Sequence, residues 1–123
     1  MFDIGKDYTR EDIHTQCGGS KQAFLPVSRG KVVAACLRAD LNPHAPEVIL
    51  CNGGAAARAA GRTLARQDGA IPVFLKRETD RFRYLGQFTV VESLTTPLEC
   101  AQYAGNSSFT ANQISRVIKL KRS

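Results

Sequence analysis

The 123-residue chain lacks any long hydrophobic run and any export signal. No stretch approaches the roughly 18 consecutive apolar residues that cross a bilayer, and the N-terminus MFDIGKDYTRED does not place a basic segment before an apolar one. No internal repeat, low-complexity tract or linker divides the sequence. We therefore expect one domain over residues 1–123 that buries a core without disulfides, in a cytoplasmic, nucleoid-associated protein without membrane contact.

Paired cysteines are also absent. The four cysteines are widely spaced, at Cys17, Cys36, Cys51 and Cys100. Without a CxxC pair, they are expected to be free thiols in a reducing compartment, and Cys36 and Cys51 lie in strand-like runs where cysteine behaves as a small core residue. A zinc site built from cysteines with His14 and His44 would lack the usual ligand spacing. We expect neither a metal site nor a cofactor.

Acidic residues are the scarcer charged type, 11 against 17 lysines and arginines, which gives a formal charge of +6. Residues 1–20 are net acidic, whereas residues 21–66 hold seven cations and two acids, and the last eight residues hold four cations and no acid. A basic chain with segregated charge favours a polyanionic partner, most commonly nucleic acid. Ribosome-like binding or binding to a membrane surface is compatible with the same charge.

Hydrophobic periodicity and turn residues predict an α+β domain. The expected elements are a helix from the Thr9 N-cap to Gly18-Gly19, strands over residues 23–27, 31–37 and 47–51, a helix from Asn52-Gly53-Gly54 to Gln67, a hairpin over 71–91, a short helix over 98–104 and a strand over 113–122. The run 31–37 is almost continuously apolar, which predicts a central strand. This order indicates a compact mixed β-sheet or open pseudo-barrel with two or three short helices.

The chain is organised around the predicted hairpin, Ile71–Val91. Its return strand places alternate residues on one apolar face: Phe82, Tyr84, Gly86, Phe88 and Val90. Four cations crowd the turn at Glu78-Thr79-Asp80: Lys76, Arg77, Arg81 and Arg83. Positive charge and a tyrosine ring beside a rigid sheet suit a phosphate backbone and a stacked base. An ordinary hairpin with a solvated tip is the alternative.

Three polar segments could contact an anion. Gly18-Gly19-Ser20-Lys21-Gln22 offers backbone amides, a cation and an amide side chain, although a helix C-cap with solvated neighbours is the simpler interpretation. Asn52-Gly53-Gly54 opens a helix but lacks the lysine of a P-loop, which makes a simple strand-to-helix turn the better interpretation. Arg58, Arg62 and Arg66 repeat every four residues, as a phosphate-binding row or a solvated face does. The rigid loop around Asn42 and His44 suits recognition or forms a structural elbow.

Several of these motifs also occur in a known family in the same order. They are Tyr8-Thr9-Arg10-Glu11-Asp12-Ile13, Gly18-Gly19-Ser20-Lys21-Gln22, Leu41-Asn42-Pro43 with Ala45-Pro46, Pro72-Val73-Phe74 and Tyr84-Leu85-Gly86. Over nearly its whole length the chain resembles PUA-like and SRA-like modules, found alone or fused to HNH nucleases in modification-dependent restriction. The resemblance implies a pseudo-barrel that binds DNA containing modified cytosine. No HNH module is recognisable here, so cutting would need a separate nuclease.

SRA-like readers flip the modified base into a pocket, although other readers contact it within the duplex. By this resemblance, Tyr84 or Phe24 is the stacking ring, and Ser20, Gln22, Asn42 or Asn52 reads the base edge. The leading hypothesis is a non-catalytic reader of 5-methylcytosine in duplex DNA. Its expected DNA-binding residues are Ser20, Lys21, Gln22, Arg29, Lys31, Arg38, Asn42, His44, Asn52, Lys76, Arg77, Arg81 and Arg83.

This hypothesis requires the cationic loops to converge on one side of the barrel. Two alternatives remain open. One is an RNA-binding PUA/ASCH-like module that prefers single-stranded or looped RNA. The other is a small enzyme acting on a modified nucleoside, with Lys21 as nucleophile or base and Glu47 or Glu92 as the acid.

Overall fold

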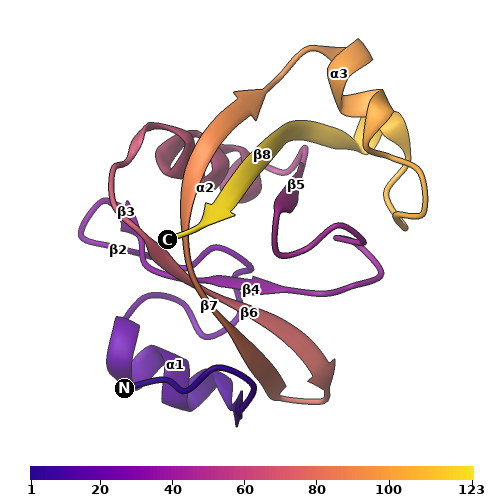
Figure 1. Cartoon of the computed structure of the whole chain (residues 1–123). Helices are drawn as coiled ribbons and strands as arrows, with labels where there is room; N and C mark the ends of the chain where they lie inside the picture. The colour runs from indigo at the N-terminus through magenta and orange to yellow at the C-terminus, as the bar shows by residue number, and fades with distance from the viewer.

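A single curled sheet organises the computed structural model, which describes residues 1–123 (Figure 1). Five strands follow the order β4-β6-β7-β8-β5, and β1 pairs with β7 off this path. The strands are β1 (Asp7–Tyr8), β2 (Val27–Ser28), β3 (Lys31–Val32), β4 (Ala35–Leu37), β5 (Val48–Asn52), β6 (Ile71–Glu78), β7 (Arg81–Leu94) and β8 (Ile114–Arg122). The helices are α1 (Arg10–Cys17), α2 (Ala55–Arg66) and α3 (Pro97–Gln102), with a 3₁₀ turn, η1 (Ala111–Gln113).

The predicted hairpin is confirmed as β6 and β7, the longest antiparallel pair in the sheet. β7 bends at Gly86, whose φ is +119°, and the register with β6 shifts between Val73 and Phe74. Before the bend, Phe82 and Tyr84 enter a secondary apolar cluster, and after it Phe88 enters the main core. Glycine suits this bend because other residues rarely adopt such a φ.

Two of the predicted strands are wrong in extent or position. Residues 31–37 form two short strands, β3 and β4, and β4 lies at one edge of the sheet instead of its centre. Both of its faces are buried: Ala35 and Leu37 pack into the main core, whereas Cys36, with the preceding residue Ala34, packs into the secondary cluster. Only Val27 of the predicted strand 23–27 is in a strand. Burial on both faces therefore explains the apolar run without a central place in the strand order.

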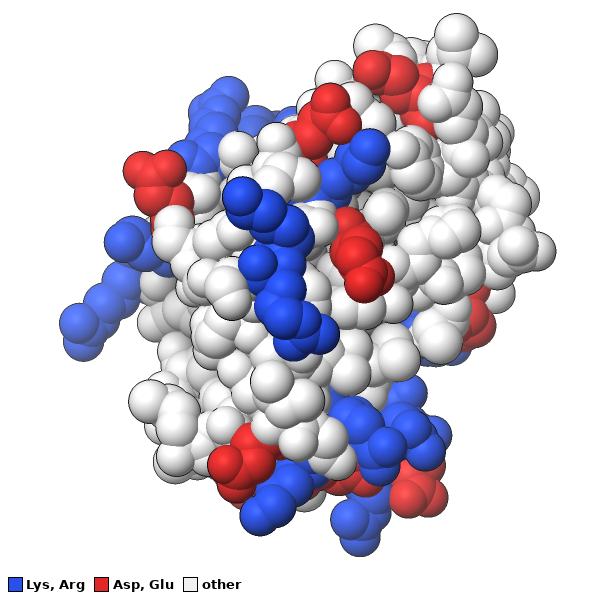
Figure 2. Space-filling model, viewed as in Figure 1, with Lys and Arg blue, Asp and Glu red and all other residues white.

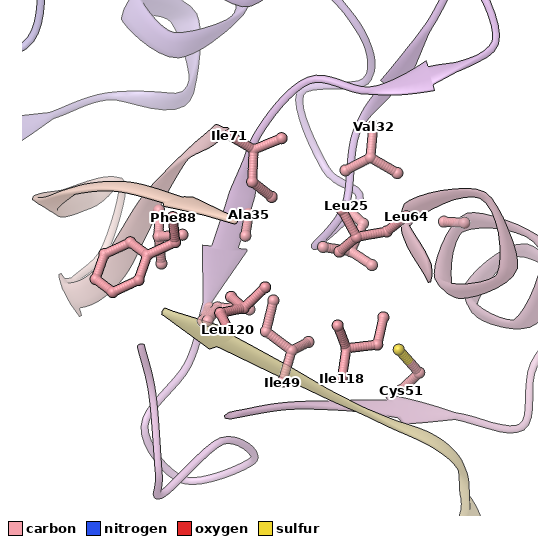
Figure 3. Packing of buried hydrophobic residues seen from close by; sticks show 13 residues of the cluster. Leu25, Val32, Ala35, Ile49, Cys51, Leu64, Ile71, Phe88, Ile118 and Leu120 are labelled. Atoms are coloured by element: carbon pink, nitrogen blue, oxygen red, sulfur yellow. The ribbon is translucent and has the colours of Figure 1, made fainter. Parts of the chain in front are cut away.

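The main core shows how the sheet closes on itself. β4 and β5 lie at opposite ends of the strand order, yet Ala35 and Leu37 share one buried cluster with Ile49 and Cys51. Figure 3 shows these strands, β8 and α2 directing apolar side chains into a common interior. The sheet is therefore an open barrel, which confirms the predicted fold class. We call the gap between the edges of β4 and β5, which do not pair with each other, the seam.

Local signals fix the helix positions. Thr9 and Asp12 form a capping box at the start of α1, and Thr96 and Glu99 form another at the start of α3. α2 packs closely on β5, because a Cβ on Gly61 would lie 3.0 Å from the Cys51 sulfur. No helix has both the length and the apolar character needed to span a bilayer.

Candidate functional site

A cavity of about 400 Å³ lies over the seam. Its walls come from the start of α1, the loop after α1, both edge strands, the 38–47 loop, the hairpin tip and the loop before β8. We call it the seam cavity. Its lining residues are Arg10, Lys21, Gln22, Phe24, Cys36, Arg38, Leu41, Asn42, Leu50, Asn52, Lys76, Asp80, Phe82 and Phe109. The fold thus brings together residues that are up to 99 positions apart in the chain (109 − 10).

Asn42 connects the two edges of the seam. It is only 4% exposed, its Oδ1 accepts a hydrogen bond from the Leu50 backbone N–H at 2.8 Å, and its Nδ2 lies 3.5 Å from the Arg38 carbonyl. Leu50 belongs to an edge strand, so the amide takes the place of a missing strand neighbour. A buried N–H without a partner is costly. Asn42 therefore positions the cavity wall from within the protein.

The other edge of the seam holds Phe24. The Cys36 N–H of β4 donates to the Phe24 carbonyl at 2.8 Å, and Val33 N–H donates to the Pro26 carbonyl at 2.9 Å. This pairing places the half-buried Phe24 side chain at the cavity, which the half-buried Phe109 also lines. Of the two rings predicted to stack on a base, Phe24 is the one that lines the cavity.

Arg10 fastens the loop after α1 to the hairpin. Its Nη2 donates to the carbonyls of Ser20 at 2.9 Å and Ala23 at 2.8 Å, and its guanidinium lies 5.6 Å from the centre of the Phe82 ring. Its backbone N–H donates to Asp80 Oδ1 at 2.8 Å. Its Nε is buried without a hydrogen-bond partner. The guanidinium thus fixes the floor of the cavity and leaves one donor unused there.

Amide side chains supply the polar groups at the cavity. Gln22 is exposed and its side chain makes no hydrogen bond, whereas Asn52 Oδ1 accepts from Gly54 N–H at 2.8 Å. Ser20 does not line the cavity, because its Oγ accepts from the backbone N–H groups of Gln22 and Ala23. Gly18 N–H donates to the His14 carbonyl, as expected of a helix C-cap. Gln22 and Asn52 are therefore the amides available to a ligand.

Most cations near the cavity are already paired with carboxylates. The pairs are Lys21–Glu11 at 2.7 Å, Arg38–Asp40 at 2.6 Å, Arg81–Glu78 at 3.6 Å and Arg83–Asp7 at 3.0 Å. The hydrogen bonds from Lys21 and Arg38 lower the pKa of Glu11 and Asp40 respectively. Lys76 and Arg77 form no ion pair and share a second hollow with Arg38. They are the free cations at the hairpin tip.

The predicted convergence of cations on one side holds only in part. Figure 2 shows basic side chains in separate groups, at the hairpin tip, at the C-terminal end of β8 and around β2–β3 and α2. Lys31 lies in a hollow with Arg62 and Arg66, and Arg29 occupies the β2–β3 turn. Arg29 and Lys31 therefore do not line the seam cavity, because the β2–β3 hairpin carries them to the end of α2.

Three further residues of the predicted site do not line the seam cavity. Tyr84 is 6% exposed and packs on Phe2 and Phe74, and its hydroxyl accepts a hydrogen bond from Gln87, so its ring is part of the secondary cluster. Arg83 is held by Asp7, because β1 pairs with β7 beside it. His44 is exposed against the Tyr103 ring and does not line the cavity.

The residues of the enzyme hypothesis do not meet. Lys21 lines the cavity, but Glu92 pairs with Lys119 on β8 at 3.4 Å, and neither Glu47 nor Glu92 lines the cavity. The carboxylate that does line it, Asp80, accepts the Arg10 N–H. The geometry therefore gives Lys21 no acid partner of the predicted kind.

The four cysteines are free. Burial raises the pKa of the Cys36 thiol to about 11 and that of the Cys51 thiol to about 12. At neutral pH the Cys36 side chain therefore lines the cavity as a neutral, weakly polar group.

Sequence reasoning missed several cavity residues. Arg10 was assigned only to the helix start, and Phe82 only to the hairpin face. Phe109 follows the loop Gly105-Asn106-Ser107-Ser108, and an aromatic residue next to a polar loop was a signal that could have found it. Leu41 and Leu50 offered no such signal, because only the curl of the sheet brings them to the seam.

A family model described as "Domain of unknown function (DUF6697)" matches residues 7–123. The chain belongs to this family. No curated protein sequence matches this DUF6697 member. Its fold matches a solved structure described as "Crystal structure of SUVH5 SRA- hemi methylated CG DNA complex", with a TM-score of 0.66 and 11% sequence identity over 99% of this chain and 89% of that chain. The SRA-like fold expected from the sequence is thereby confirmed for this DUF6697 domain.

Proposed function

We propose that this DUF6697 domain is a non-catalytic reader of modified cytosine, in the first place 5-methylcytosine, and that it holds the base in the seam cavity. The observation that carries the proposal is a cavity of about 400 Å³, bordered by an aromatic ring and two amides, at the open seam of a barrel. The similar SRA structure is described as a complex with hemimethylated DNA. Ligand pockets in proteins commonly measure about 300–1,000 Å³, so the cavity is large enough for a ligand.

The lining chemistry suits a flipped cytosine. An amide side chain both donates and accepts, so Gln22 or Asn52 matches the mixed donors and acceptors of the pairing edge of cytosine. Phe24 provides a face for stacking, which contributes about 1–3 kcal/mol per base. Flipping costs a few kcal/mol, so stacking and edge contacts together can offset it.

The modified group needs an apolar contact. Leu41 and Phe109, both half-buried, offer apolar surface within the same cavity. One well-fitted methyl contact is worth about 1–3 kcal/mol, a preference of roughly 5- to 150-fold over plain cytosine. Most of the affinity would come from phosphate contacts, among them Lys76 and Arg77, and would fall steeply with salt.

Competition binding tests the proposal. Matched duplexes with one central cytosine, either methylated or plain, would be titrated across a salt series, with Phe24→Ala as the variant. Val91→Ala is the control, because Val91 is an exposed apolar residue that lines none of the hollows near the cavity. We expect the wild type and Val91→Ala to prefer the methylated duplex and Phe24→Ala to lose that preference. Equal binding of both duplexes by the wild type at every salt concentration would remove the reader function. Stronger competition by looped RNA would replace it with RNA binding.

A further inference from the structure

A group of three cations without ion pairs lies away from the seam cavity, at the C-terminal end of α2. A hollow of about 350 Å³ there is lined without any apolar residue, by Gly30, Lys31, Arg62, Thr63, Arg66 and Gln67. We call it the basic hollow. Lys31, Arg62 and Arg66 belong to none of the six ion pairs in the structure. The positive charge here is therefore not neutralised by carboxylates, as it is around most of the seam cavity.

The basic hollow is held in shape by Gln67. Its Oε1 accepts the Val32 N–H at 2.9 Å and its Nε2 donates to the Val32 carbonyl at 2.8 Å. These two hydrogen bonds fasten β3 to the end of α2. Lys31 from the β2–β3 hairpin therefore stays beside Arg62 and Arg66 from the helix. Three like charges kept together without a counter-ion favour a bound anion.

Arg58 does not belong to this group. Its Nε turns back to donate to the Gly53 carbonyl at 2.8 Å. The row predicted from sequence, Arg58, Arg62 and Arg66, is thus divided by the structure. The first arginine closes the start of the helix, and the other two face the hollow with Lys31.

An apolar groove joins the basic hollow to the seam cavity. The groove has a volume of about 710 Å³ and runs between α2 and residues 20–27. It shares Phe24 and Asn52 with the seam cavity and Thr63 with the basic hollow. On the helix its floor follows the four-residue spacing of Ala55, Ala59 and Thr63, which places them on one face. The small side chains leave room for an elongated ligand from one site to the other.

The length of α2 gives the distance between the seam cavity and the basic hollow. The helix has 12 residues, which at 1.5 Å per residue is about 18 Å. For a duplex whose axis follows α2, with a rise of about 3.4 Å per base pair along that axis, this corresponds to about five base pairs. A strand whose modified base occupies the seam cavity would therefore reach the basic hollow about five nucleotides away.

We propose that Lys31, Arg62 and Arg66 form a second phosphate-binding site, which holds the DNA backbone about five base pairs from the base in the seam cavity. The spacing rests on the proposed reader function, whereas the phosphate contact does not. Phosphates carry no information about the modified base, so this site adds affinity equally for methylated and plain DNA.

The test uses Arg62→Gln/Arg66→Gln in the full chain. On duplexes with about eight base pairs on each side of the cytosine, long enough to reach the hollow, we expect affinity to fall on the order of tenfold and the salt slope to become shallower by about 2. On duplexes with about three base pairs on each side, we expect the variant to match the wild type. The ratio of methylated to plain binding should stay unchanged.

Two control variants distinguish the loss of this particular site from a general loss of positive charge, and a folding measurement excludes unfolding as the cause. Lys6→Gln/Lys121→Gln removes the same charge from residues that line neither the cavity, the groove nor the hollow, and Arg62→Lys/Arg66→Lys keeps the charge at the hollow. Both should retain the wild-type salt slope, and thermal unfolding should confirm that all variants fold. An unchanged slope in the glutamine variant overturns the second site, with the reader function intact. A wild type that ignores methylation, while the slope still depends on Arg62 and Arg66, overturns the reader function alone.

Discussion

The side-chain oxygen of Asn42 accepts the backbone N–H of Leu50 at 2.8 Å, across the seam of the open barrel. Leu50 lies on an edge strand and Asn42 in the loop that leads to it, so one amide completes the hydrogen bonding that a neighbouring strand would otherwise supply. Asn42 is 4% exposed and also lines the cavity. The same residue thus stabilises the fold and shapes the candidate site.

Asn42→Ala should therefore destabilise the domain. The substitution leaves the buried Leu50 N–H without its partner, which costs about 1–3 kcal/mol. Chemical denaturation would measure the loss. Asn52→Ala is the control, because its Oδ1 accepts only the exposed Gly54 N–H. A loss in Asn42→Ala no larger than in Asn52→Ala would contradict the bridging role.

Arg10→Met should loosen the loop that carries Phe24. The guanidinium holds the Ser20 and Ala23 carbonyls, and hydrogen bonds from a charged donor are worth about 1.5–3 kcal/mol each in favourable cases. We expect lower stability and weaker preference for methylated DNA, measured by denaturation and by competition binding. Lys6→Met is the control. It removes one exposed cation that forms an ion pair with Asp3, and it should change neither the stability nor the preference for methylated DNA. A stable Arg10→Met protein with full preference would show that the loop is fixed by other contacts.

Substitutions of the two candidate stacking residues, Tyr84 and Phe24, should have different effects on stability and on DNA binding. Tyr84→Phe removes only the hydroxyl that accepts from Gln87, and we expect a small loss of stability with unchanged DNA binding. Tyr84→Ala empties part of the secondary cluster and should cost about 3–5 kcal/mol, as other buried aromatic truncations do. Phe24→Leu keeps an apolar side chain but removes the ring and should weaken binding without unfolding the protein. These effects are measured by thermal unfolding and gel shift. Strong binding by Phe24→Leu would exclude stacking on this ring.

The contribution of each hairpin cation to DNA binding should depend on whether a carboxylate already pairs with it. Lys76→Gln/Arg77→Gln removes two unpaired charges and should make the salt slope of DNA binding shallower by about 2. Arg83→Gln breaks a half-buried pair with Asp7, so we expect reduced stability and an almost unchanged slope. Binding titrations over a salt series, combined with denaturation, measure both quantities. If Arg83→Gln changes the slope as much as the double variant does, Arg83 contacts phosphate despite its pairing.

Stability should fall in alkaline solution because two thiols are buried. Their pKa is about 11 for Cys36 and about 12 for Cys51 in the fold, against an ordinary value of 9.0. Above pH 9 the unfolded chain releases thiol protons that the folded chain keeps. The stabilisation that comes from keeping these thiols neutral in the fold is therefore complete below pH 9 and is lost as the pH rises toward 11. The free energy of unfolding falls by up to about 1.4 kcal/mol per pH unit for each thiol.

Denaturation curves at pH 8, 9 and about 10 would measure this decline. Cys36→Ala/Cys51→Ala is the comparison, because lysines and tyrosines titrate alike in both proteins. An equally steep decline in the double variant would assign the pH dependence to those other groups.

Local patterns in the sequence were sufficient for the helices and the central hairpin. Thr9 with Asp12 marked the start of α1, and the alternation from Phe82 to Phe88 marked β7, because capping and side-chain direction depend on neighbouring residues alone. Side-chain burial did not fix strand order, however. β4 is buried on both faces and still lies at an edge, since loops and a secondary cluster cover it as completely as strands would.

The amino-acid sequence by itself determined an open-barrel fold class, a basic surface and the residue types of a polar and aromatic site. Only the tertiary structure decided which of those residues meet. The curl of the sheet brings Phe24, Asn42 and Asn52 to one cavity, and the β2–β3 hairpin, fastened to α2 by Gln67, carries Lys31 to Arg66. The tertiary structure also pairs Arg83 with Asp7 and packs Tyr84 on Phe74. Contacts between distant segments depend on how the chain closes, and no local pattern encodes that closure.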